Sequence, residues 1–128
     1  MDLWDFKNGD RNEIAIWAKR LSVRDRAALN QKLDLLERLD PQQAIGLKLL
    51  GGPIKSTRHI LELHVSAEKA LRPLLCRGPH MPLGEYTLLA AAETRDWKLH
   101  PSGALDRAIQ NREKVLHDIT LRVKHERA

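Results

Sequence analysis

Three short apolar runs between His59 and Pro101 constrain the fold more than any other part of the chain. The runs cover residues 59–65, 70–77 and 86–93. Each run is rich in Leu, Ile, Val or Thr, and each has the length of a strand rather than of a helix. The polar break at 66–69 is short enough for a hairpin, and the break at 78–84, with two prolines, is typical of a surface loop. The pattern predicts a three-stranded antiparallel meander.

The sequence before the meander predicts one strand and two helices. Leu3–Phe6 is expected to form a short edge strand. A helix capped by Asp10 is expected to run to about Arg20, and a second helix begins after Ser22, which caps it. A leucine stripe at helical spacing marks the buried face of the second helix, and Pro41 lies just beyond its end. The two helices are expected to form a hairpin on one face of the sheet.

Weaker signals complete the order of the elements. Residues 44–50 form a brief apolar segment that predicts one or two helical turns. After the meander, Ser102 is expected to cap a helix that ends near His117, and the basic segment 118–128 predicts a tail that frays. All 128 residues are therefore expected to form a single α+β domain with the order β-α-α-β-β-β-α. Its antiparallel sheet carries the helical hairpin on one face and is followed by the C-terminal helix.

Composition limits the classes of function. The chain is 42% hydrophobic and 30% charged, as in ordinary globular domains, and its longest apolar run, Leu88–Ala92, is far too short to cross a bilayer. The N-terminus is acidic where a signal peptide needs positive charge, and the single Cys76 can form no internal disulfide, so a cytoplasmic location is expected. The net charge of +5 favours an anionic partner, of which nucleic acid is the commonest.

Strand alternation assigns the side chains of the meander to two faces. His59 and His64 are separated by an odd number of residues, so they point to opposite faces and make a poor metal pair, whereas Glu62 shares the face of His64. The chain has no His-Glu-x-x-His motif and no second cysteine, so we expect neither a metal site nor a cofactor. Pro73 cannot donate to the ladder, and a bulge is expected near it.

A series of short motifs runs along the chain. They are LKLLGGP before the meander, ILEL in its first strand, ALRPLLCRG in its second, YTLLAAAETRDWKLHP around its third, and ALDRA at the start of the last helix. In this order they resemble the RelE superfamily of ribosome-dependent mRNA-cleaving toxins, in its HigB-like, phage-derived branch. The similarity runs from about Leu3 to Leu116.

The resemblance implies both an activity and partners. It implies a RelE-like fold and the toxin of a type II toxin–antitoxin system, an endoribonuclease (mRNA interferase) that cleaves mRNA in the ribosomal A site through attack of the 2′-hydroxyl, without a metal ion. The expected partners are mRNA, the ribosome and an antitoxin encoded nearby, often a helix-turn-helix protein. No membrane partner is expected.

The resemblance also implies site residues. Arg72 falls on the arginine of the family's second meander strand, which clamps the transition-state phosphate, and Arg95 falls on the cation that follows the last strand. His64 stands where the family has an arginine, and Leu75 stands where it has an aromatic residue. The site therefore departs from the family pattern at two positions.

Metal-free RNA cleavage needs a base for the 2′-hydroxyl, a cation for the phosphorane and an acid for the leaving oxygen. Arg72 and Arg95 are candidates for the cation, since guanidinium matches phosphate bidentately, and His64 or His59 is a candidate for the acid or base. Together, Arg72, Arg95 and His64 form the expected catalytic set. The remaining candidates are expected to bind RNA, Trp97 by stacking on a base: His59, Arg77, Lys98 and Trp97.

Each candidate also has a structural interpretation. The two histidines would then be structural or solvated, Arg72 would protect a sheet edge, and Trp97 would cover the last helix; Arg77 and Lys98 would be solvated. At the level of the whole protein, the alternative to a toxin is a non-catalytic phage-derived module of the same fold that binds RNA or protein. The two hypotheses differ on whether His64, Arg72 and Arg95 converge on one concave surface.

Overall fold

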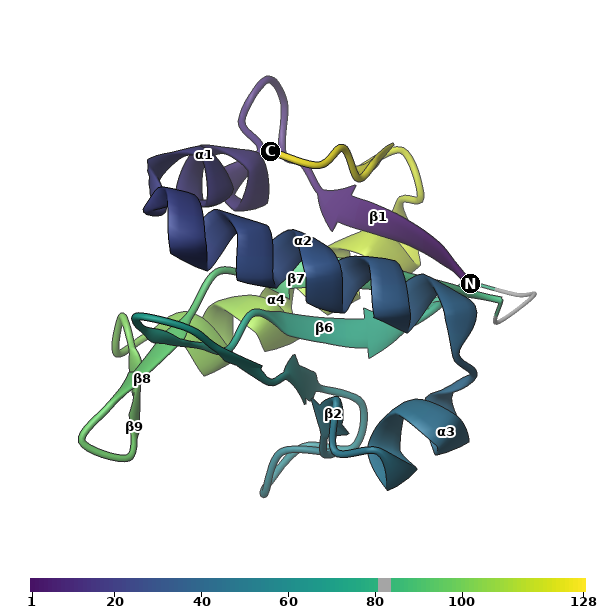
Figure 1. The fold of residues 1–128 in the computed structure, drawn as a ribbon. Helices are drawn as coiled ribbons and strands as arrows, with labels where there is room; N and C mark the ends of the chain where they lie inside the picture. Colours follow the sequence, from purple (N-terminus) through teal and green to yellow (C-terminus); the bar gives the residue numbers. More distant parts are fainter. Residues whose placement is uncertain (81–83) are drawn as a thin grey trace.

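A computed structural model of the chain describes residues 1–80 and 84–128, so that 81–83, within the loop predicted at 78–84, lie outside the described residues. The described residues form four helices and two sheets (Figure 1). The helices are Glu13–Arg20 (α1), Val23–Arg38 (α2), Pro41–Gly46 (α3) and Ala104–His117 (α4). The predicted α+β class is therefore confirmed.

The larger sheet has six strands in the order β10-β1-β7-β6-β3-β2 within the described residues. These strands are Asp2–Phe6 (β1), Leu50–Gly51 (β2), Leu61–Leu63 (β3), Leu74–Arg77 (β6), Glu85–Ala90 (β7) and Arg122–Lys124 (β10). β1 runs parallel to β7, and every other pair of neighbours is antiparallel. The prediction that the first strand lies at an edge is wrong, because β10 pairs along its outer side.

The smaller sheet has four antiparallel strands in the order β4-β5-β8-β9. They are Val65–Ser66 (β4), Ala70–Leu71 (β5), Glu93–Arg95 (β8) and Lys98–His100 (β9). Each run of the predicted meander contributes one strand to each sheet, so the chain bends three times at the junction between them. At one bend Pro73 offers no N–H, and the register shifts between Leu74 and Leu75, close to the expected bulge.

Helices cover both faces of the six-stranded sheet (Figure 1). One core cluster joins the leucines of α2 to Leu63, Leu75 and Leu88 of the sheet, and the other joins the alanines of α4 to Cys76 and Leu89. Because both faces are covered, neighbouring residues of β6 are buried although they point in opposite directions. Each fully buried leucine contributes about 1.5–3 kcal/mol of hydrophobic free energy.

Side-chain caps start α1, α2 and α3, but not α4. Ser22 caps α2 as predicted, since its hydroxyl accepts a hydrogen bond from the Asp25 backbone N–H at 3.1 Å. The cap of α1 is Asn12 rather than Asp10, because Asn8 and Arg11 first pair across a tight turn. Ser102 does not cap α4, whose N-cap position is occupied by Gly103 without a side-chain hydrogen bond.

Pro41, predicted to mark the end of the second helix, also starts the next one. It occupies the first turn of α3, and Asp40 and Gln43 form a capping box around it. The predicted helical turn at 44–50 therefore begins three residues earlier than expected, and it ends at Gly46.

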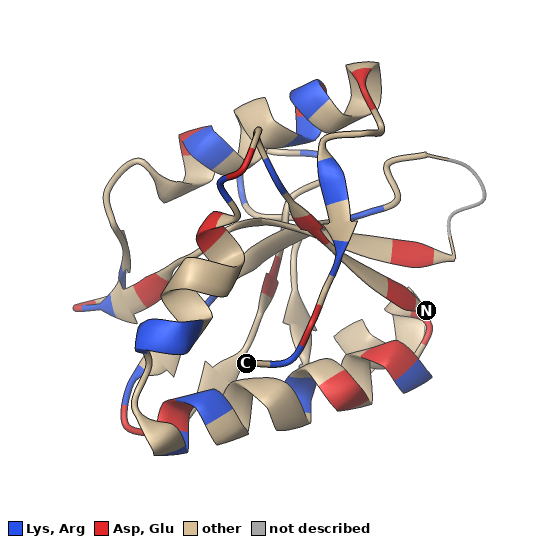
Figure 2. Ribbon diagram, turned by 90° about the horizontal axis from the view of Figure 1, so that it is seen from above, with Lys and Arg blue, Asp and Glu red and all other residues tan. Residues whose placement is uncertain are grey.

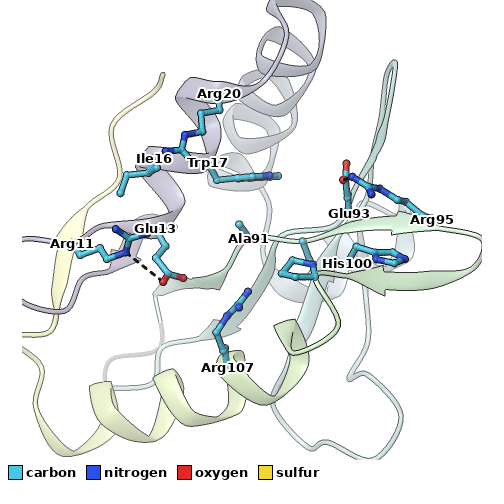
Figure 3. A pocket seen from close by; sticks show the side chains of 12 residues that line it. Arg11, Glu13, Ile16, Trp17, Arg20, Ala91, Glu93, Arg95, His100 and Arg107 are labelled. Atoms are coloured by element: carbon cyan, nitrogen blue, oxygen red, sulfur yellow. Dashed lines mark hydrogen bonds and ion pairs between the residues drawn. The ribbon is translucent and has the colours of Figure 1, made fainter.

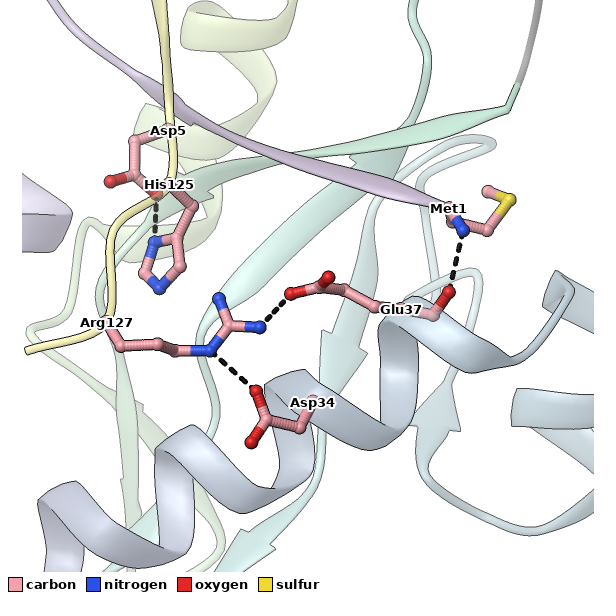
Figure 4. A network of polar contacts seen from close by, with 6 residues as sticks. All are labelled: Met1, Asp5, Asp34, Glu37, His125 and Arg127. Carbon is pink, nitrogen blue, oxygen red and sulfur yellow. Dashed lines mark hydrogen bonds and ion pairs between the residues drawn. The ribbon is translucent and has the colours of Figure 1, made fainter.

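The prediction that the C-terminal segment frays is wrong, because its charged side chains contact the sheet and α2. Arg122 is 4% exposed, forms an ion pair of 2.6 Å with Glu85 and lies over the Trp4 ring, with 4.4 Å from its guanidinium carbon to the ring centroid. His125 Nδ1 lies 2.8 Å from Asp5 Oδ1, and Arg127 pairs with Asp34 at 2.9 Å and with Glu37 of α2 (Figure 4). The tail is therefore part of the folded domain.

Candidate functional site

A cavity of about 560 Å³ lies beside the hairpin of β8 and β9, where the larger sheet passes into the smaller one. We call it the hairpin cavity. Its lining comprises Glu62, His64, Ala70, Arg72, Thr94, Asp96, Trp97 and Leu99. Three residues selected from the sequence, His64, Arg72 and Trp97, thus come together from three separate segments of the chain.

The first functional feature of the hairpin cavity is a carboxylate–imidazole pair. Glu62 Oε1 lies 3.1 Å from His64 Nε2, and about a third of each side chain is exposed. Strand alternation places both residues on one face, as predicted. Gly51 leaves the room for the ring, because a Cβ atom there would lie 2.7 Å from His64 Nε2. The sequence placed Glu62 beside His64, but it was not selected as a site residue.

The second feature is the anchored guanidinium of Arg72. Its Nη1 donates hydrogen bonds to the carbonyl oxygens of Leu71 at 2.8 Å and of Val65 at 3.3 Å. Its backbone N–H donates to the Ala92 carbonyl oxygen at 2.8 Å, which joins the second and third runs of the meander. Nε and Nη2 make no hydrogen bond to the described residues, so they are available to phosphate oxygens.

The third feature is an exposed ring at the tip of the β8–β9 hairpin. Asp96 and Trp97 form the two-residue turn with φ of 48° and 67°, the left-handed conformation that a hairpin of this length requires. A tryptophan in this conformation costs about 1–2 kcal/mol relative to one with negative φ. Trp97 is 98% exposed, so the alternative that it covers the last helix is wrong.

Arg95 does not join the hairpin cavity. In the smaller sheet Ala70 pairs with Thr94, whereas Leu71 pairs with Glu93, so Arg72 and Arg95 lie on opposite faces. Arg95 forms an ion pair with Glu93 and lines a different cavity. The prediction that Arg72 and Arg95 act on one phosphate is therefore wrong, and Arg95 does not converge with His64 and Arg72. The register of β5 with β8, which decides this, was not readable from the sequence.

Three other candidates lie outside the hairpin cavity as well. His59 is exposed in the loop before β3 and lines a small cavity of about 140 Å³ beside α4. Arg77 is exposed at the end of β6 that lies away from Arg72, and Lys98 is exposed opposite Arg95. Lys98 is close to the cavity in sequence, but as the partner of Arg95 it lies on the opposite face of the hairpin.

The buried Cys76 and Tyr86 are unsuited to chemistry near neutral pH. Burial under α4 raises the pKa of the Cys76 thiol to about 12, and burial likewise raises the pKa of the Tyr86 phenol to about 12. Both groups remain protonated at neutral pH. Cys76 therefore acts as a small buried hydrophobe.

Neither the distribution of charge along the helices nor the placement of metal-ligating side chains indicates a further site in the described residues. Figure 2 shows Lys and Arg interspersed with Asp and Glu along the long helices rather than gathered on them as a basic stripe. Over residues 1–80 and 84–128, no group of three or more His, Cys, Asp or Glu side chains is placed to hold a metal ion. In the same residues, no helix combines the length and apolar character that spanning a membrane requires.

Comparison with known proteins adds no relative from which function could be transferred. No protein-family model, curated protein sequence or solved structure matches the chain. The RelE-like identity that the motifs imply stays a prediction, and the geometry of the hairpin cavity carries the functional argument.

Proposed function

We propose that this protein binds single-stranded RNA in the hairpin cavity and cleaves it without a metal ion. The observation that carries the proposal is the convergence of three functional groups on one cavity: the Glu62–His64 pair, the guanidinium of Arg72 and the exposed ring of Trp97. An acid–base pair, a fixed cation and a stacking surface are the parts that such a reaction needs.

The geometry supports a role for each side chain. In the proposed reaction Glu62 accepts a hydrogen bond from His64 Nε2–H, the contact of 3.1 Å, and Nδ1 of that tautomer acts as the base. Nδ1 takes the proton of the 2′-hydroxyl, and the 2′-oxygen then attacks the adjacent phosphorus. Arg72 stabilises the charge that develops on the phosphoryl oxygens, while Trp97 stacks on a neighbouring base. The bond from phosphorus to the 5′-oxygen breaks, and water protonates that oxygen. The products are a 2′,3′-cyclic phosphate and a 5′-hydroxyl.

The motifs that resemble the RelE superfamily support a biological setting for this reaction. In our proposal the substrate is mRNA on the ribosome, the protein is the toxin of a type II toxin–antitoxin pair in the cytoplasm, and a nearby gene encodes its antitoxin. The α+β class that the resemblance implies is the class that the structure has.

One observation favours a second candidate, a non-catalytic RNA- or protein-binding module of the same fold. Arg95, which the family pattern places in the site, faces away from Arg72 and is paired with Glu93. Only one guanidinium therefore faces the scissile phosphate in the hairpin cavity, among the residues that the structure describes. This candidate predicts binding without cleavage.

The test is an RNA cleavage assay with the full chain, in EDTA, on a labelled oligoribonucleotide and on mRNA in programmed ribosomes. We expect products that end in a 2′,3′-cyclic phosphate, and a single 2′-deoxy substitution should protect the bond that follows it. His64→Gln should abolish cleavage, whereas His59→Gln, an exposed histidine outside the hairpin cavity, should not. Binding without cleavage on both substrates would establish the second candidate instead.

A cellular assay tests the proposed setting. Induced expression in a bacterial host should arrest growth and cleave mRNA, and Arg72→Gln should relieve both effects. Normal growth with intact mRNA, from a chain that is expressed and folded, would contradict the toxin role. A small helix-turn-helix gene beside this reading frame would support it.

A further inference from the structure

A second cavity of about 560 Å³ lies on the other face of the smaller sheet, between α1, the ends of β7 and β9, and the start of α4 (Figure 3). We call it the arginine cavity, because four arginines from four segments line it: Arg11, Arg20, Arg95 and Arg107. We propose that the arginine cavity binds a nucleotide, with its phosphates on the arginines and its base on the ring of Trp17. This site is separate from the hairpin cavity and does not depend on RNA cleavage.

The charges of the arginine cavity call for an anion. Its lining contains four arginines and two glutamates, which leaves a formal charge of +2. Arg11 pairs with Glu13 at 3.7 Å and Arg95 pairs with Glu93, but neither Arg20 nor Arg107 has an ion pair with a described residue. Like charges that share a concave surface repel one another until a counter-ion neutralises them.

Arg107 places a guanidinium that has no ion pair with a described residue in the arginine cavity. Its Nε is buried and has no hydrogen-bond partner in residues 1–80 and 84–128. Figure 3 shows its side chain rising from α4 into the arginine cavity. Because Nε is buried, the terminal nitrogens of Arg107 are the atoms that a phosphate in the cavity would contact, and guanidinium suits phosphate well.

The apolar part of the arginine cavity distinguishes a nucleotide from a simple anion. The Trp17 ring extends from α1 into the cavity, where Ala91 and Pro101 provide further apolar surface (Figure 3). A flat aromatic surface beside cations matches a base that is joined to phosphate. The volume lies within the range of about 300–1,000 Å³ that is typical of small-molecule sites. An acidic peptide would satisfy the arginines but would leave the ring of Trp17 without a flat partner.

The nucleotide could be free or could be one residue of an RNA strand, and equilibrium dialysis with two probes separates these sources. The probes are ADP and a short oligouridylate, each with the full chain at low salt. Arg20→Gln removes one exposed, unpaired cation from the cavity, and Arg107→Gln removes the unsatisfied donor. Each should weaken binding about tenfold. Lys19→Gln is the matched control, because Lys19 is the exposed neighbour of Arg20 but does not line this cavity, and it should change binding less than about twofold.

Each outcome decides the proposal. Binding of ADP that Arg20→Gln weakens and Lys19→Gln does not indicates a site for free nucleotides. Binding of oligouridylate alone, weakened by Arg20→Gln and not by Arg72→Gln, assigns the cavity to one nucleotide of an RNA strand. Three results would overturn the proposal: no binding of either probe, equal weakening by the Lys19 and Arg20 variants, or displacement of ADP by tetraglutamate or inorganic phosphate at equal concentration.

The two proposals can fail separately. Loss of oligouridylate binding in Arg72→Gln alone concerns the hairpin cavity, whereas loss in Arg20→Gln alone concerns the arginine cavity. Circular dichroism of the Arg107 variant should match that of the unmodified chain. If Arg107→Gln fails to fold, the exposed Arg20 still provides the test.

Discussion

The hairpin cavity and the arginine cavity share a wall, the β8–β9 hairpin, but they present different chemistry. The hairpin cavity contains one anchored arginine and a histidine hydrogen-bonded to a glutamate. The arginine cavity contains four arginines, and its histidine, His100, makes no side-chain hydrogen bond within the described part of the chain. A base held by a carboxylate suits catalysis, whereas a ring of cations beside an aromatic side chain suits binding. The comparison teaches that alternation along a single short hairpin divides these two sets of side chains between its faces.

The β8–β9 hairpin, which separates the two cavities, also has a strained backbone at its turn. The turn of the hairpin places the bulky Trp97 in the left-handed region, where glycine or asparagine would be cheaper. A residue that costs stability and is almost fully exposed points to selection for binding rather than for folding.

After His64→Gln, the largest effect on cleavage should come from Arg72→Gln. This change removes the cation that faces the phosphate in the hairpin cavity, so the rate of RNA cleavage should fall by about 10²–10³-fold. Cleavage kinetics on the oligoribonucleotide measure the effect. Arg77→Gln is the matched control, because it removes the same charge from the far end of β6, outside the cavity, and it should retain most of the activity. Equal losses in the two variants would show that only net charge matters.

The next effect should come from Trp97→Gly. Loss of the ring should weaken RNA binding by about 5- to 150-fold, the range for removal of one stacked base. Glycine should at the same time relieve the strain of the turn, so that the free energy of unfolding stays unchanged or rises by up to about 1 kcal/mol. Fluorescence anisotropy and urea denaturation measure the two quantities. A variant that loses both affinity and stability would show that Trp97 is structural.

Cys76, in the core between the sheet and α4, should be unreactive, in contrast to the side chains of the two cavities. Its pKa of about 12 predicts that iodoacetamide at pH 8 labels the unfolded chain but not the folded one. In the unfolded chain the thiol loses its proton near its ordinary pKa of 9.0, so the stability of the fold should decrease as the pH rises from about 9 to about 12. Cys76→Ala should remove this contribution to the loss of stability between about pH 9 and pH 12. Rapid labelling of the folded chain would contradict the assignment.

The smallest effect on cleavage should come from Arg95→Gln. Because Arg95 faces the arginine cavity and is paired with Glu93, its loss should change the cleavage rate less than about twofold. The same variant should weaken nucleotide binding in the dialysis assay. A loss of cleavage as large as that of Arg72→Gln would mean that the hairpin rearranges on RNA and brings both arginines to one face, and the division between the two cavities would not hold.

The local parts of the fold were predictable. Ser22 and the leucine stripe defined α2, the three apolar runs defined the strands, and alternation placed Glu62 with His64 on one face. These features depend on residues within a few positions of one another, so the chain expresses them without reference to its distant parts. The same reasoning could not show that the basic segment 118–128 adds a strand to the sheet, because the partners of its charges lie on β1, β7 and α2.

The candidate site shows the same limit. Sequence by itself determined the α+β class, the order of the main elements and the shared face of Glu62 and His64. Only the tertiary structure decided which residues share a cavity. Arg72 lines one cavity with His64 and Trp97, whereas Arg95 lines another, on the opposite face, with Arg107 and Trp17. The reason is physical: the face of a side chain depends on the parity of its own strand, but its neighbours depend on the register between strands that are joined by bends and loops.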